Sequence, residues 1–334
     1  MTKIDYLCYD TNKMKKVLES SEEMKKVIVI VGPTAVGKTN LSIEVAKAFN
    51  GEVISGDSMQ IYRGMDIGTA KITPEEMEGI PHHLIDIKDP MESFSVAEFQ
   101  KLVREKIDEI TARGKMPIIV GGTGLYVQSV LYDYQFTEQE VDHELRAQLE
   151  ARIAKGEGAL LYEELKQVDP VAAQSIHPNN IRRVMRALEI FYSSGEKKSE
   201  MRERKQPGLL YDAAIIALTM DREKLYERIN LRVDIMLKEG LLEEVKQLHT
   251  ARVRNVQSVQ AIGYKEIYAY LDGEVTYEQA VEQLKQNSRN YAKRQLTWFR
   301  NKIDANWFDI VEKGENSIKE IIQFLAGKLN NSAN

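Results

Sequence analysis

Short apolar runs alternate with longer amphipathic stretches over the first third of the chain after residue 24. Residues 27–31 (VIVIV) predict a buried strand, and residues 41–49 (LSIEVAKAF) predict the helix that follows it. Further strands are expected at 53–55, 82–87 and 116–120, and an amphipathic helix that ends at Gly114 precedes the last of them. Strands that alternate with helices favour a doubly wound parallel sheet, in which ligands bind at the carboxyl ends of strands.

The pattern becomes wholly helical at about Asp133 and returns to a strand at 211–220, where Asp221 is expected to cap the next helix. The predicted fold class is therefore α/β, a doubly wound parallel sheet with a helical insertion domain. The expected parts are a core of 24–134 and 207–334, an insertion of 135–206, and a dispensable extension of residues 1–23.

Composition limits the classes of protein. The 334 residues are 43% hydrophobic and 29% charged, which suits a soluble globular chain with a sizeable core. Neither a membrane span nor a signal-peptide core is evident, so a cytoplasmic protein that does not engage membranes is expected. The single cysteine, Cys8, forbids an internal disulfide. With a net charge of −5, any nucleic acid must meet a local basic patch, and a monomer is expected for want of heptads.

The first predicted strand leads into GPTAVGKT, which has the glycine, lysine and threonine spacing of a P-loop. The predicted doubly wound parallel sheet is therefore of the P-loop kinase-like type. Its glycines let backbone N–H groups converge on phosphate oxygens, and the following helix adds its positive end. Lys38 would supply a charge, and the Thr39 hydroxyl a ligand for Mg²⁺. The residues expected to bind a diphosphate are Gly32, Pro33, Thr34, Ala35, Val36, Gly37, Lys38 and Thr39. The loop alone does not tell whether phosphate is transferred, hydrolysed or expelled.

Two more loops, SGDSMQIY and GGTGLY, leave the carboxyl ends of predicted strands and should meet the P-loop at one site. Asp57 could act as a base toward a bound nucleophile or as a partner of Mg²⁺. The alternative is that Asp57 and Ser58 only cap a turn. Ser58, Gln60 and Thr123 carry short polar groups suited to the edge of a nucleobase.

The motifs GPTAVGKT, SGDSMQIYRGMDIGTAK, PHHLID, GGTGLY, HPNN with RALE, QAIGYKE and AKRQLTWFRN occur in this order, and together they resemble the tRNA dimethylallyltransferase (tRNA isopentenyltransferase) family of bacterial type. The resemblance covers residues 27 to about 301. It implies transfer of a dimethylallyl group from dimethylallyl diphosphate to N6 of adenosine 37 in tRNA, with release of diphosphate. It further implies that Asp57 is the general base and that Lys38, Mg²⁺ and Arg222 stabilise the leaving group.

RNA binding requires a local positive surface, and the insertion offers Arg182, Arg183 and Arg186 at helical spacing. With the resemblance, the residues expected at the tRNA are Asp57, Ser58, Met59, Gln60, Thr123, Arg182, Arg183 and Arg186. A late helix adds further cations, namely Arg289, Lys293, Arg294, Arg300 and Lys302. A solvated basic face is the ordinary alternative for both groups, and core positions are favoured for the neighbouring Trp298 and Phe299.

Three other functions are compatible with parts of the sequence. A P-loop kinase would hold ATP in the same cradle, with Asp86 as its Walker B acid. An RNA-binding regulatory NTPase would lack transferase chemistry, and a related enzyme would isopentenylate free AMP or ADP. The histidines, His82, His83, His143, His177 and His249, are expected to be structural, because adjacent strand residues point to opposite faces and cannot easily share a metal.

Overall fold

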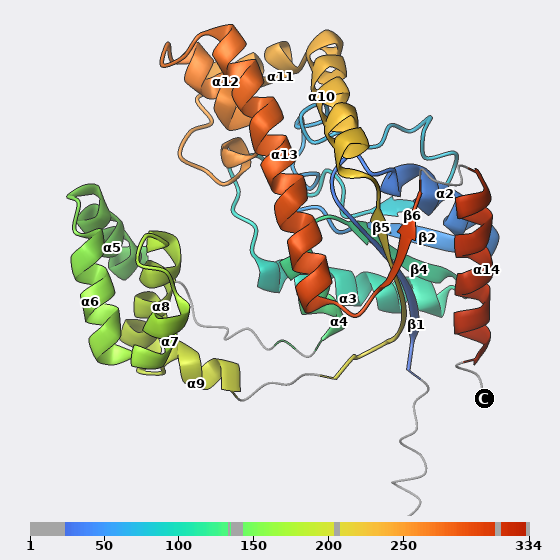
Figure 1. Ribbon diagram of the computed structural model, residues 1–334, viewed down its shortest axis with the longest axis horizontal. Helices are drawn as coiled ribbons and strands as arrows, with labels where there is room; N and C mark the ends of the chain where they lie inside the picture. Colours follow the sequence, from blue (N-terminus) through green and yellow to red (C-terminus); the bar gives the residue numbers. More distant parts are fainter. Residues whose placement is uncertain (1–23, 133, 135–142, 204–207, 311–314, 332–334) are drawn as a thin grey trace, which may run out of the picture. The chain divides into compact units, whose positions relative to one another are not determined.

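The computed structural model describes residues 24–132, 134, 143–203, 208–310 and 315–331. The chain divides into two units, one formed by the segments that end at Tyr132 and resume at Leu209, and one formed by Asp133–Gly208 (Figure 1). The predicted insertion, 135–206, falls inside the second unit. Cys8 and the predicted extension lie outside the described residues. In the part of the chain that the structure describes, no helix is long and apolar enough to cross a membrane.

The larger unit is built on a six-stranded sheet in the order β3-β2-β4-β1-β5-β6. All its strand pairs are parallel, as the alternation of strands and helices predicts. The strands are β1 (Lys26–Val31), β2 (Gly51–Ser55), β3 (His82–His83), β4 (Met116–Gly121), β5 (Asp212–Thr219) and β6 (Asn306–Asp309). The carboxyl ends of β2, β4 and β1 are therefore neighbours, and the loops that leave them start side by side.

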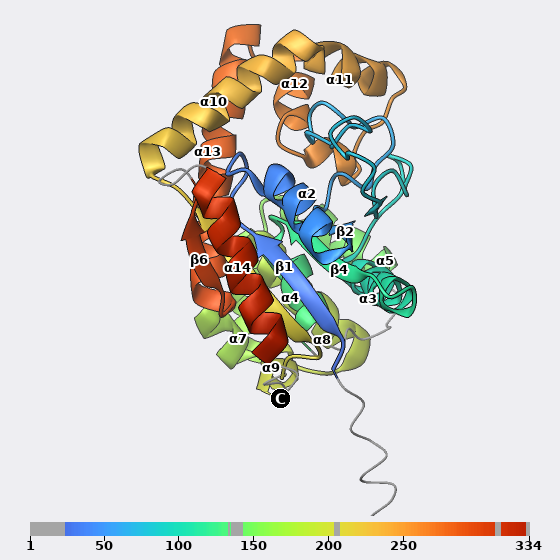
Figure 2. The ribbon, with the colours of Figure 1, turned by 90° about the vertical axis from the view of Figure 1, so that its right-hand side faces the viewer.

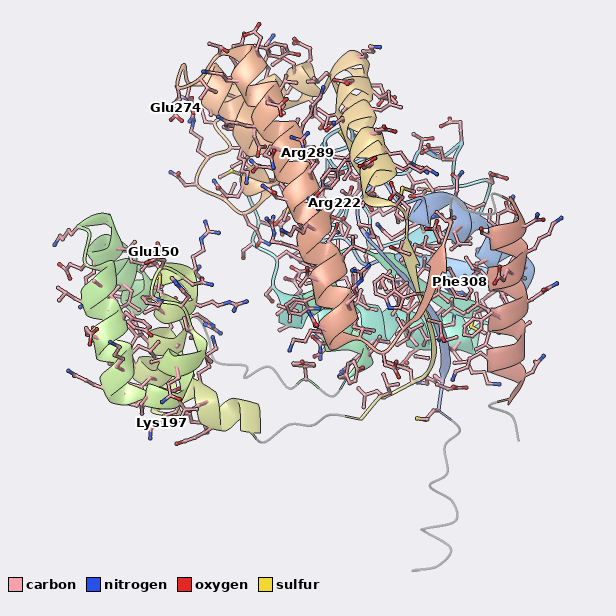
Figure 3. All side chains as sticks on the ribbon, viewed as in Figure 1. Glu150, Lys197, Arg222, Glu274, Arg289 and Phe308 are labelled. Carbon is pink, nitrogen blue, oxygen red and sulfur yellow. The ribbon has the colours of Figure 1, made fainter. Side chains whose placement is uncertain are left out.

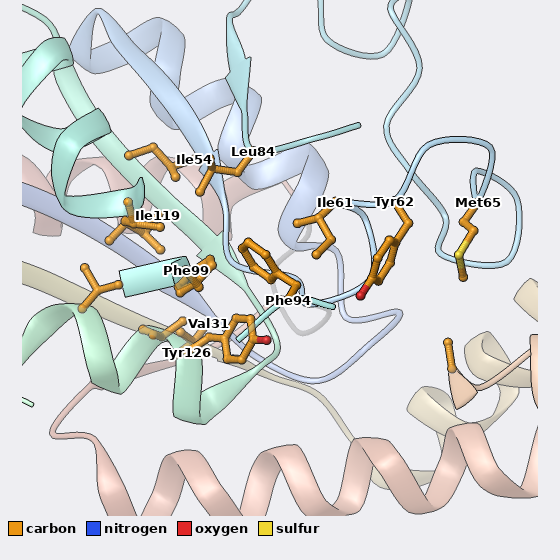
Figure 4. Close-up of a cluster of buried hydrophobic side chains, with 14 of the residues drawn as sticks. Val31, Ile54, Ile61, Tyr62, Met65, Leu84, Phe94, Phe99, Ile119 and Tyr126 are labelled. Atoms are coloured by element: carbon orange, nitrogen blue, oxygen red, sulfur yellow. The ribbon is translucent and has the colours of Figure 1, made fainter. Parts of the chain in front are cut away.

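Both faces of the sheet are covered, so successive residues of β1 are buried on opposite sides. On one face, Ile28 and Ile30 pack with α2 (Lys38–Phe49) and α14 (Glu315–Asn331), which lie together in Figure 2. On the other, Val27, Val29 and Val31 pack with α3 (Val96–Ala112) and α4 (Gly124–Leu131). Figure 4 shows part of this second layer, where Phe94, Phe99 and Tyr126 cluster beside Val31. The sheet is thus a fixed platform for the loops at its edge.

The third predicted strand is mostly wrong. Residues 82–87 were expected to be extended, whereas β3 contains only His82 and His83. Leu84 and Asp86 have φ angles of 61° and 56°, in the left-handed region that ends a strand. The predicted start of the helix after the fifth strand is confirmed. Asp221 caps α10 by accepting hydrogen bonds from the backbone N–H groups of Glu223 and Lys224.

Four helices lie between β5 and β6 in the chain, namely α10 (Arg222–Glu239), α11 (Leu241–Thr250), α12 (Tyr264–Leu271) and α13 (Tyr277–Lys302). A short 3₁₀ turn, Ser258–Gln260, precedes α12. The long helix α13 packs on α10, α12 and α4, so it passes directly over the loop ends (Figure 1). Phe299 of this helix is fully buried and Trp298 packs partly against the same core, which confirms the core assignment of both residues.

The smaller unit has a hydrophobic core of its own, centred on Leu161, Leu165, Val184 and Leu188. Its helices are α5 (His143–Ala154), α6 (Gly158–Val168), α7 (Pro170–Ser175), α8 (Ile181–Ser194) and α9 (Lys198–Glu203). Asp169 is buried, caps α7 through the N–H of Ala172, and accepts a hydrogen bond from the Ser199 hydroxyl at 2.7 Å. This carboxylate therefore ties α9 to the rest of the unit.

Candidate active site

The loops after β2 and β4 are in backbone contact. The N–H of Gly56 donates to the carbonyl oxygen of Val120 at 2.7 Å. A Cβ atom at Gly121 would lie 2.4 Å from the carbonyl oxygen of Gly56, a distance that only glycine avoids. Further along, the hydroxyl of Thr123 lies 3.4 Å from that of Ser58. The chain thus brings the predicted GDSMQ and GGTG loops together, as their positions after neighbouring strands require.

The P-loop curls between β1 and α2 with positive φ angles at Ala35 and Gly37, of 64° and 107°. Helix α2 begins at Lys38, so its N-terminal N–H groups face the loop. The Lys38 ammonium folds back over the loop and donates to the carbonyl oxygens of Gly32 and Pro33 at 3.0 and 2.7 Å. This is the curled geometry that the glycine spacing predicts for a phosphate cradle.

Lys38 has a strongly altered proton affinity. Its pKa is lowered to about 7, first because the surrounding protein removes water from the ammonium and second because the Arg232 cation lies nearby. The Asp57 carboxylate acts in the opposite direction and raises the pKa. A bound polyanion would replace the lost solvation and would therefore raise the pKa of Lys38 again.

Two pockets open on this edge of the sheet, with volumes of about 380 and 330 Å³. The first, here the phosphate pocket, is lined by Gly37, Lys38 and Thr39 of the P-loop and by the loops after β2 and β4. The second, here the acceptor pocket, is lined largely by α10, α12 and α13 and by the segment 260–263. Five residues line both pockets: Thr34, Asp57, Thr69, Arg232 and Tyr291. The two pockets therefore share one wall, and that wall carries an acid, a cation and a phenol.

Asp57 is the one carboxylate among the described residues that line these pockets. Its Oδ1 accepts a hydrogen bond from the backbone N–H of Met59 at 2.8 Å. Asp57 therefore caps a turn, as the alternative given in the sequence analysis predicts. A carboxylate has a second oxygen, and the side chain as a whole still faces both pockets. Capping therefore fixes the orientation of Asp57 without excluding a chemical role.

The arginine at the P-loop is not the one that the sequence suggested. Arg222 is exposed at the first turn of α10 (Figure 3), its guanidinium lies 5.2 Å from the centroid of the Tyr226 ring, and it lines neither pocket. Arg232, ten residues or ~15 Å further along the helix, lies within 3.3 Å of the Thr34 hydroxyl and lines both pockets. The geometry favours Arg232 over Arg222 as the cation that meets a ligand in the cradle.

Two residues that the sequence analysis did not single out for the site come from α13. Gln295 is buried, accepts a hydrogen bond from the Thr34 N–H at 2.9 Å and donates to the carbonyl oxygen of Gly122 at 3.0 Å. Tyr291 is hydrogen-bonded to the Thr123 and Gln295 side chains, and burial raises its pKa to about 12. Their only signal in the sequence is their place in and beside AKRQLTWFRN, because contacts across more than 160 residues leave no local pattern.

The remaining predicted polar residues of the loop have mixed surroundings. Gln60 lines the phosphate pocket, but its amide is engaged by the Ser55 hydroxyl and by the carbonyl oxygens of Thr69 and Ala70. Ser58 and Met59 line the acceptor pocket. Thr123 contacts Ser58 and Tyr291 without lining either pocket. Gln60 is thus a brace for the loop around Thr69 more than a free reader of a base.

The basic residues predicted to meet RNA fall into paired and unpaired groups. In α8, Arg186 donates to Glu189 at 3.1 Å, whereas Arg182 and Arg183 are exposed and form no ion pair with the described residues. On α13, Arg289 (Figure 3) donates to Glu282 and to Asn230. Arg294 of the same helix is exposed and lines the acceptor pocket. Arg182, Arg183 and Arg294 are therefore exposed cations that no carboxylate of the described residues compensates.

Four histidines have partners within the fold, and the side chain of His143 lies outside what the structure describes. His82 contacts the carbonyl oxygen of Ile80, His83 contacts Glu52 at 2.7 Å, His177 accepts from the Asn179 N–H, and His249 contacts Asp272. Across the described ranges no group of three or more metal-ligating side chains gathers. Asp86 pairs with Lys71 and lines neither pocket, which removes it as a Walker B acid at this site.

The donors around the cradle suit a hard cation that keeps most of its water. Thr39 and Asp57 both line the phosphate pocket, and together they offer a hydroxyl and a carboxylate oxygen. Mg²⁺ is commonly bound by one or two such groups together with substrate phosphates. The residues present therefore fit an ion that would enter with a diphosphate, and they do not fit an all-protein metal cage.

The fold and this site define an α/β P-loop protein whose cradle adjoins a second ligand pocket. Comparisons with known proteins identify the family. Residues 60–302 match the family model described as IPP transferase. Over 312 residues, 93% of this chain, the sequence is 61% identical to tRNA dimethylallyltransferases of Bacillus mycoides and Bacillus anthracis, and the match covers 98% and 99% of those proteins.

Comparison with solved structures identifies the same family. A tRNA isopentenylpyrophosphate transferase from Bacillus halodurans is 55% identical with a TM-score of 0.71, over 92% of this chain and 98% of that one. A eukaryotic dimethylallyltransferase solved with tRNA is 35% identical with a TM-score of 0.77, over 91% of this chain and 80% of that one. The chain therefore belongs to the tRNA dimethylallyltransferase (IPP transferase) family, in its bacterial form, and it is an enzyme of the transferase class.

Proposed function

We propose that the protein transfers the dimethylallyl group of dimethylallyl diphosphate to N6 of adenosine 37 in tRNA and releases diphosphate. The observation that carries this proposal is the shared wall of the two pockets. Asp57 and Arg232 line both pockets, so a donor in one and an acceptor in the other would meet at an acid and a cation. The names of the relatives support tRNA as the acceptor and a dimethylallyl group as the group transferred, and the ordered motifs support the choice of donor and of adenosine.

The phosphate pocket would hold the donor by its diphosphate. In the reaction the bond between C1 of the allyl group and its oxygen breaks, and negative charge builds up on the departing diphosphate. Lys38 and Arg232 line this pocket and α2 begins beside it, so these two cations and the first N–H groups of α2 would stabilise this charge. Mg²⁺, held by Thr39 and by the diphosphate, would neutralise part of the same charge when bound.

The acceptor pocket would take the adenine. Adenine N6 is a neutral, weak nucleophile, which loses a proton as its bond to C1 forms. Asp57 lies on the shared wall and is the one carboxylate that the described lining offers, so we assign it as the base that accepts this proton. Its fixed orientation toward Met59 N–H helps to hold the carboxylate in place for the transfer.

The acceptor base must leave its stack to reach such a pocket, as single-stranded RNA allows. We assign the helical insertion a role in binding tRNA, through the unpaired Arg182 and Arg183 and less through Arg186, whose cation is already paired with Glu189. Met59, Ser58, Gln60 and Thr123 remain proposed contacts near the base. A monomer that acts in the cytoplasm completes the proposal.

The rival functions fit the site less well. A kinase with a Walker B acid would be expected to place a second carboxylate near its Mg²⁺, and among the described lining residues Asp57 stands alone. An AMP or ADP acceptor would have no use for the exposed arginines of α8. A regulatory NTPase would not need an acceptor pocket that shares its wall with the cradle.

One experiment separates the candidates. The enzyme is incubated with labelled dimethylallyl diphosphate, Mg²⁺ and unmodified tRNA, and in parallel with AMP or with ATP. Label in the tRNA, located by digestion and mass spectrometry at N6 of adenosine 37, is the expected result. Label in AMP, or turnover of ATP without labelled RNA, would overturn the proposal in favour of one rival.

A further inference from the structure

The outer end of the acceptor pocket carries two cations that the transfer chemistry does not use, Lys265 of α12 and Arg294 of α13. We propose that Arg294, assisted by Lys265, binds a backbone phosphate that flanks the acceptor adenosine. The proposal rests on the function proposed above and names the part of the RNA that this end of the pocket recognises, a phosphodiester of a single-stranded segment.

Arg294 is placed for such a contact by the helix that carries it. It lies one turn beyond Tyr291, whose ring is 5.6 Å from the guanidinium carbon, and Tyr291 itself lines both pockets. The stacked ring limits the rotation of the guanidinium at the pocket edge. Among the described residues no carboxylate pairs with Arg294, in contrast to Arg289, which donates to Glu282 at 3.1 Å. Arg294 is therefore oriented, exposed and uncompensated.

Lys265 lines the same pocket from the first turn of α12. Its ammonium lies 3.7 Å from Glu266, which is beyond hydrogen-bond distance. The Glu266 carboxylate is already engaged, because it accepts hydrogen bonds from the Gly263 N–H at 2.8 Å and from the Asn287 amide at 2.7 Å. Most of the charge of Lys265 thus remains available at the pocket edge, where its side chain is exposed.

The orientation of the bound nucleotide determines which of its groups Arg294 would contact. If adenine enters with N6 at Asp57, its ribose and the two adjoining phosphates remain at the open end. A guanidinium can bind two oxygens of one phosphate at once, and an ammonium adds a point charge. Arg294 and Lys265 would then help hold the nucleotide with its base extruded.

The test pairs an enzyme variant with a modified RNA. Arg294→Ala and wild-type enzyme are assayed with tRNA assembled by ligation, so that one uncharged methylphosphonate replaces the phosphate on the 5′ or the 3′ side of adenosine 37. Lys319→Ala is the matched control, because Lys319 is an exposed cation of α14 that lines neither pocket. Thermal unfolding of each variant checks the fold.

With ordinary tRNA, Arg294→Ala is expected to lower kcat/KM for tRNA about 10-fold or more, while Lys319→Ala stays within about 2-fold. One of the two methylphosphonates should lower kcat/KM of the wild type by a similar factor and abolish the difference between wild type and Arg294→Ala. Equal losses from Arg294→Ala on all three RNAs, or no loss on any, would overturn the assignment. If Arg294→Ala does not fold, insensitivity of the wild type to both methylphosphonates would overturn it instead. Absence of transfer by the wild type to ordinary tRNA would instead overturn the proposed function.

Discussion

Gln295 accepts a hydrogen bond from the backbone N–H of Thr34 at 2.9 Å, so a helix near the end of the chain holds the middle of the P-loop. The same amide donates to Gly122 and connects the loop after β4. Gln295→Ala leaves the Thr34 N–H without a partner. We expect it to lower the free energy of unfolding by ~1–3 kcal/mol and to raise KM for the donor more than KM for tRNA.

The control for this prediction is Gln283→Ala, the same change at an exposed position of α13 that lines neither pocket. It should leave the free energy of unfolding and the KM for the donor close to their wild-type values. Denaturant unfolding and steady-state kinetics measure them. If Gln295→Ala changed stability alone, with both KM values at the wild-type level, Gln295 would be a packing residue without influence on the cradle.

Alanine substitutions of Arg232 and Arg222 are predicted to have different effects on the transfer rate, although both residues lie on α10. Arg232 lines both pockets, so Arg232→Ala should lower the transfer rate by about 10²- to 10³-fold through lost stabilisation of the leaving group. Arg222→Ala should remain within about 2-fold, because its guanidinium lies over Tyr226. Single-turnover transfer with saturating donor compares them. The opposite ranking of the two variants would restore the role first expected for Arg222.

Binding of diphosphate is predicted to be coupled to protonation of Lys38. Its pKa of about 7 in the free protein leaves the amine largely neutral at pH 8, and a bound diphosphate must raise that pKa by solvating the charged form. Binding of inorganic diphosphate at pH 8 should therefore take up about one proton more in the wild type than in Lys38→Arg, whose cation is always charged. At pH 6 the amine is already protonated, so the difference should vanish.

Calorimetry in buffers of different ionisation enthalpy measures this uptake, and the comparison of variants removes the titration of diphosphate itself. The affinity of the wild type should also fall as pH rises above 7, more steeply than that of Lys38→Arg. Equal proton uptake by both proteins at pH 8 would contradict the lowered pKa of Lys38.

The arginines of α8 differ in what they can offer to RNA. Arg182 and Arg183 are exposed and unpaired within the described chain, so Arg182→Ala with Arg183→Ala should weaken tRNA binding and reduce the slope of log K against log salt by roughly 1 to 2. Arg186→Ala should have a smaller effect, since Glu189 already compensates Arg186. Filter binding over a salt series measures the slopes. The control is Lys166→Ala, which changes a cation of α6 that is paired with Glu163. If the double variant had the same slope as the wild type, Arg182 and Arg183 would be solvent-exposed residues that do not contact the tRNA.

The sequence predicted the parts of this molecule that depend on local patterns. The strand at 27–31, the P-loop turn and the Asp221 cap each follow from a few consecutive residues, and all three occur in the structure. The strand at 82–87 failed because Leu84 and Asp86 adopt left-handed angles that no apolar pattern reveals. Asp86 was lost as a candidate ligand for the same reason, since the turn directs it to Lys71.

The site was predicted less completely, because its contacts join distant segments. Asp57 closely follows β2 and Lys38 belongs to the GPTAVGKT motif, so both could be found in sequence. Gln295 and Tyr291 reach the site only through the packing of α13. The choice between Arg222 and Arg232 depends on which turn of α10 passes the cradle. That register is set by tertiary packing and leaves no mark in the local sequence beyond the spacing of Arg228 and Arg232, four residues apart and both in the lining of the phosphate pocket.

Asp57 is the centre of the account, and two variants separate its two properties. Asp57→Asn retains an oxygen that can accept the hydrogen bond from Met59 N–H, whereas Asp57→Ala removes both that bond and the carboxylate. The most direct test is single-turnover dimethylallyl transfer to tRNA by both variants, with tRNA affinity measured alongside. We predict that each loses about 10²- to 10⁴-fold in rate with little change in tRNA affinity. A rate for Asp57→Asn close to that of the wild type would contradict the account, because it would show that Asp57 shapes a turn and accepts no proton.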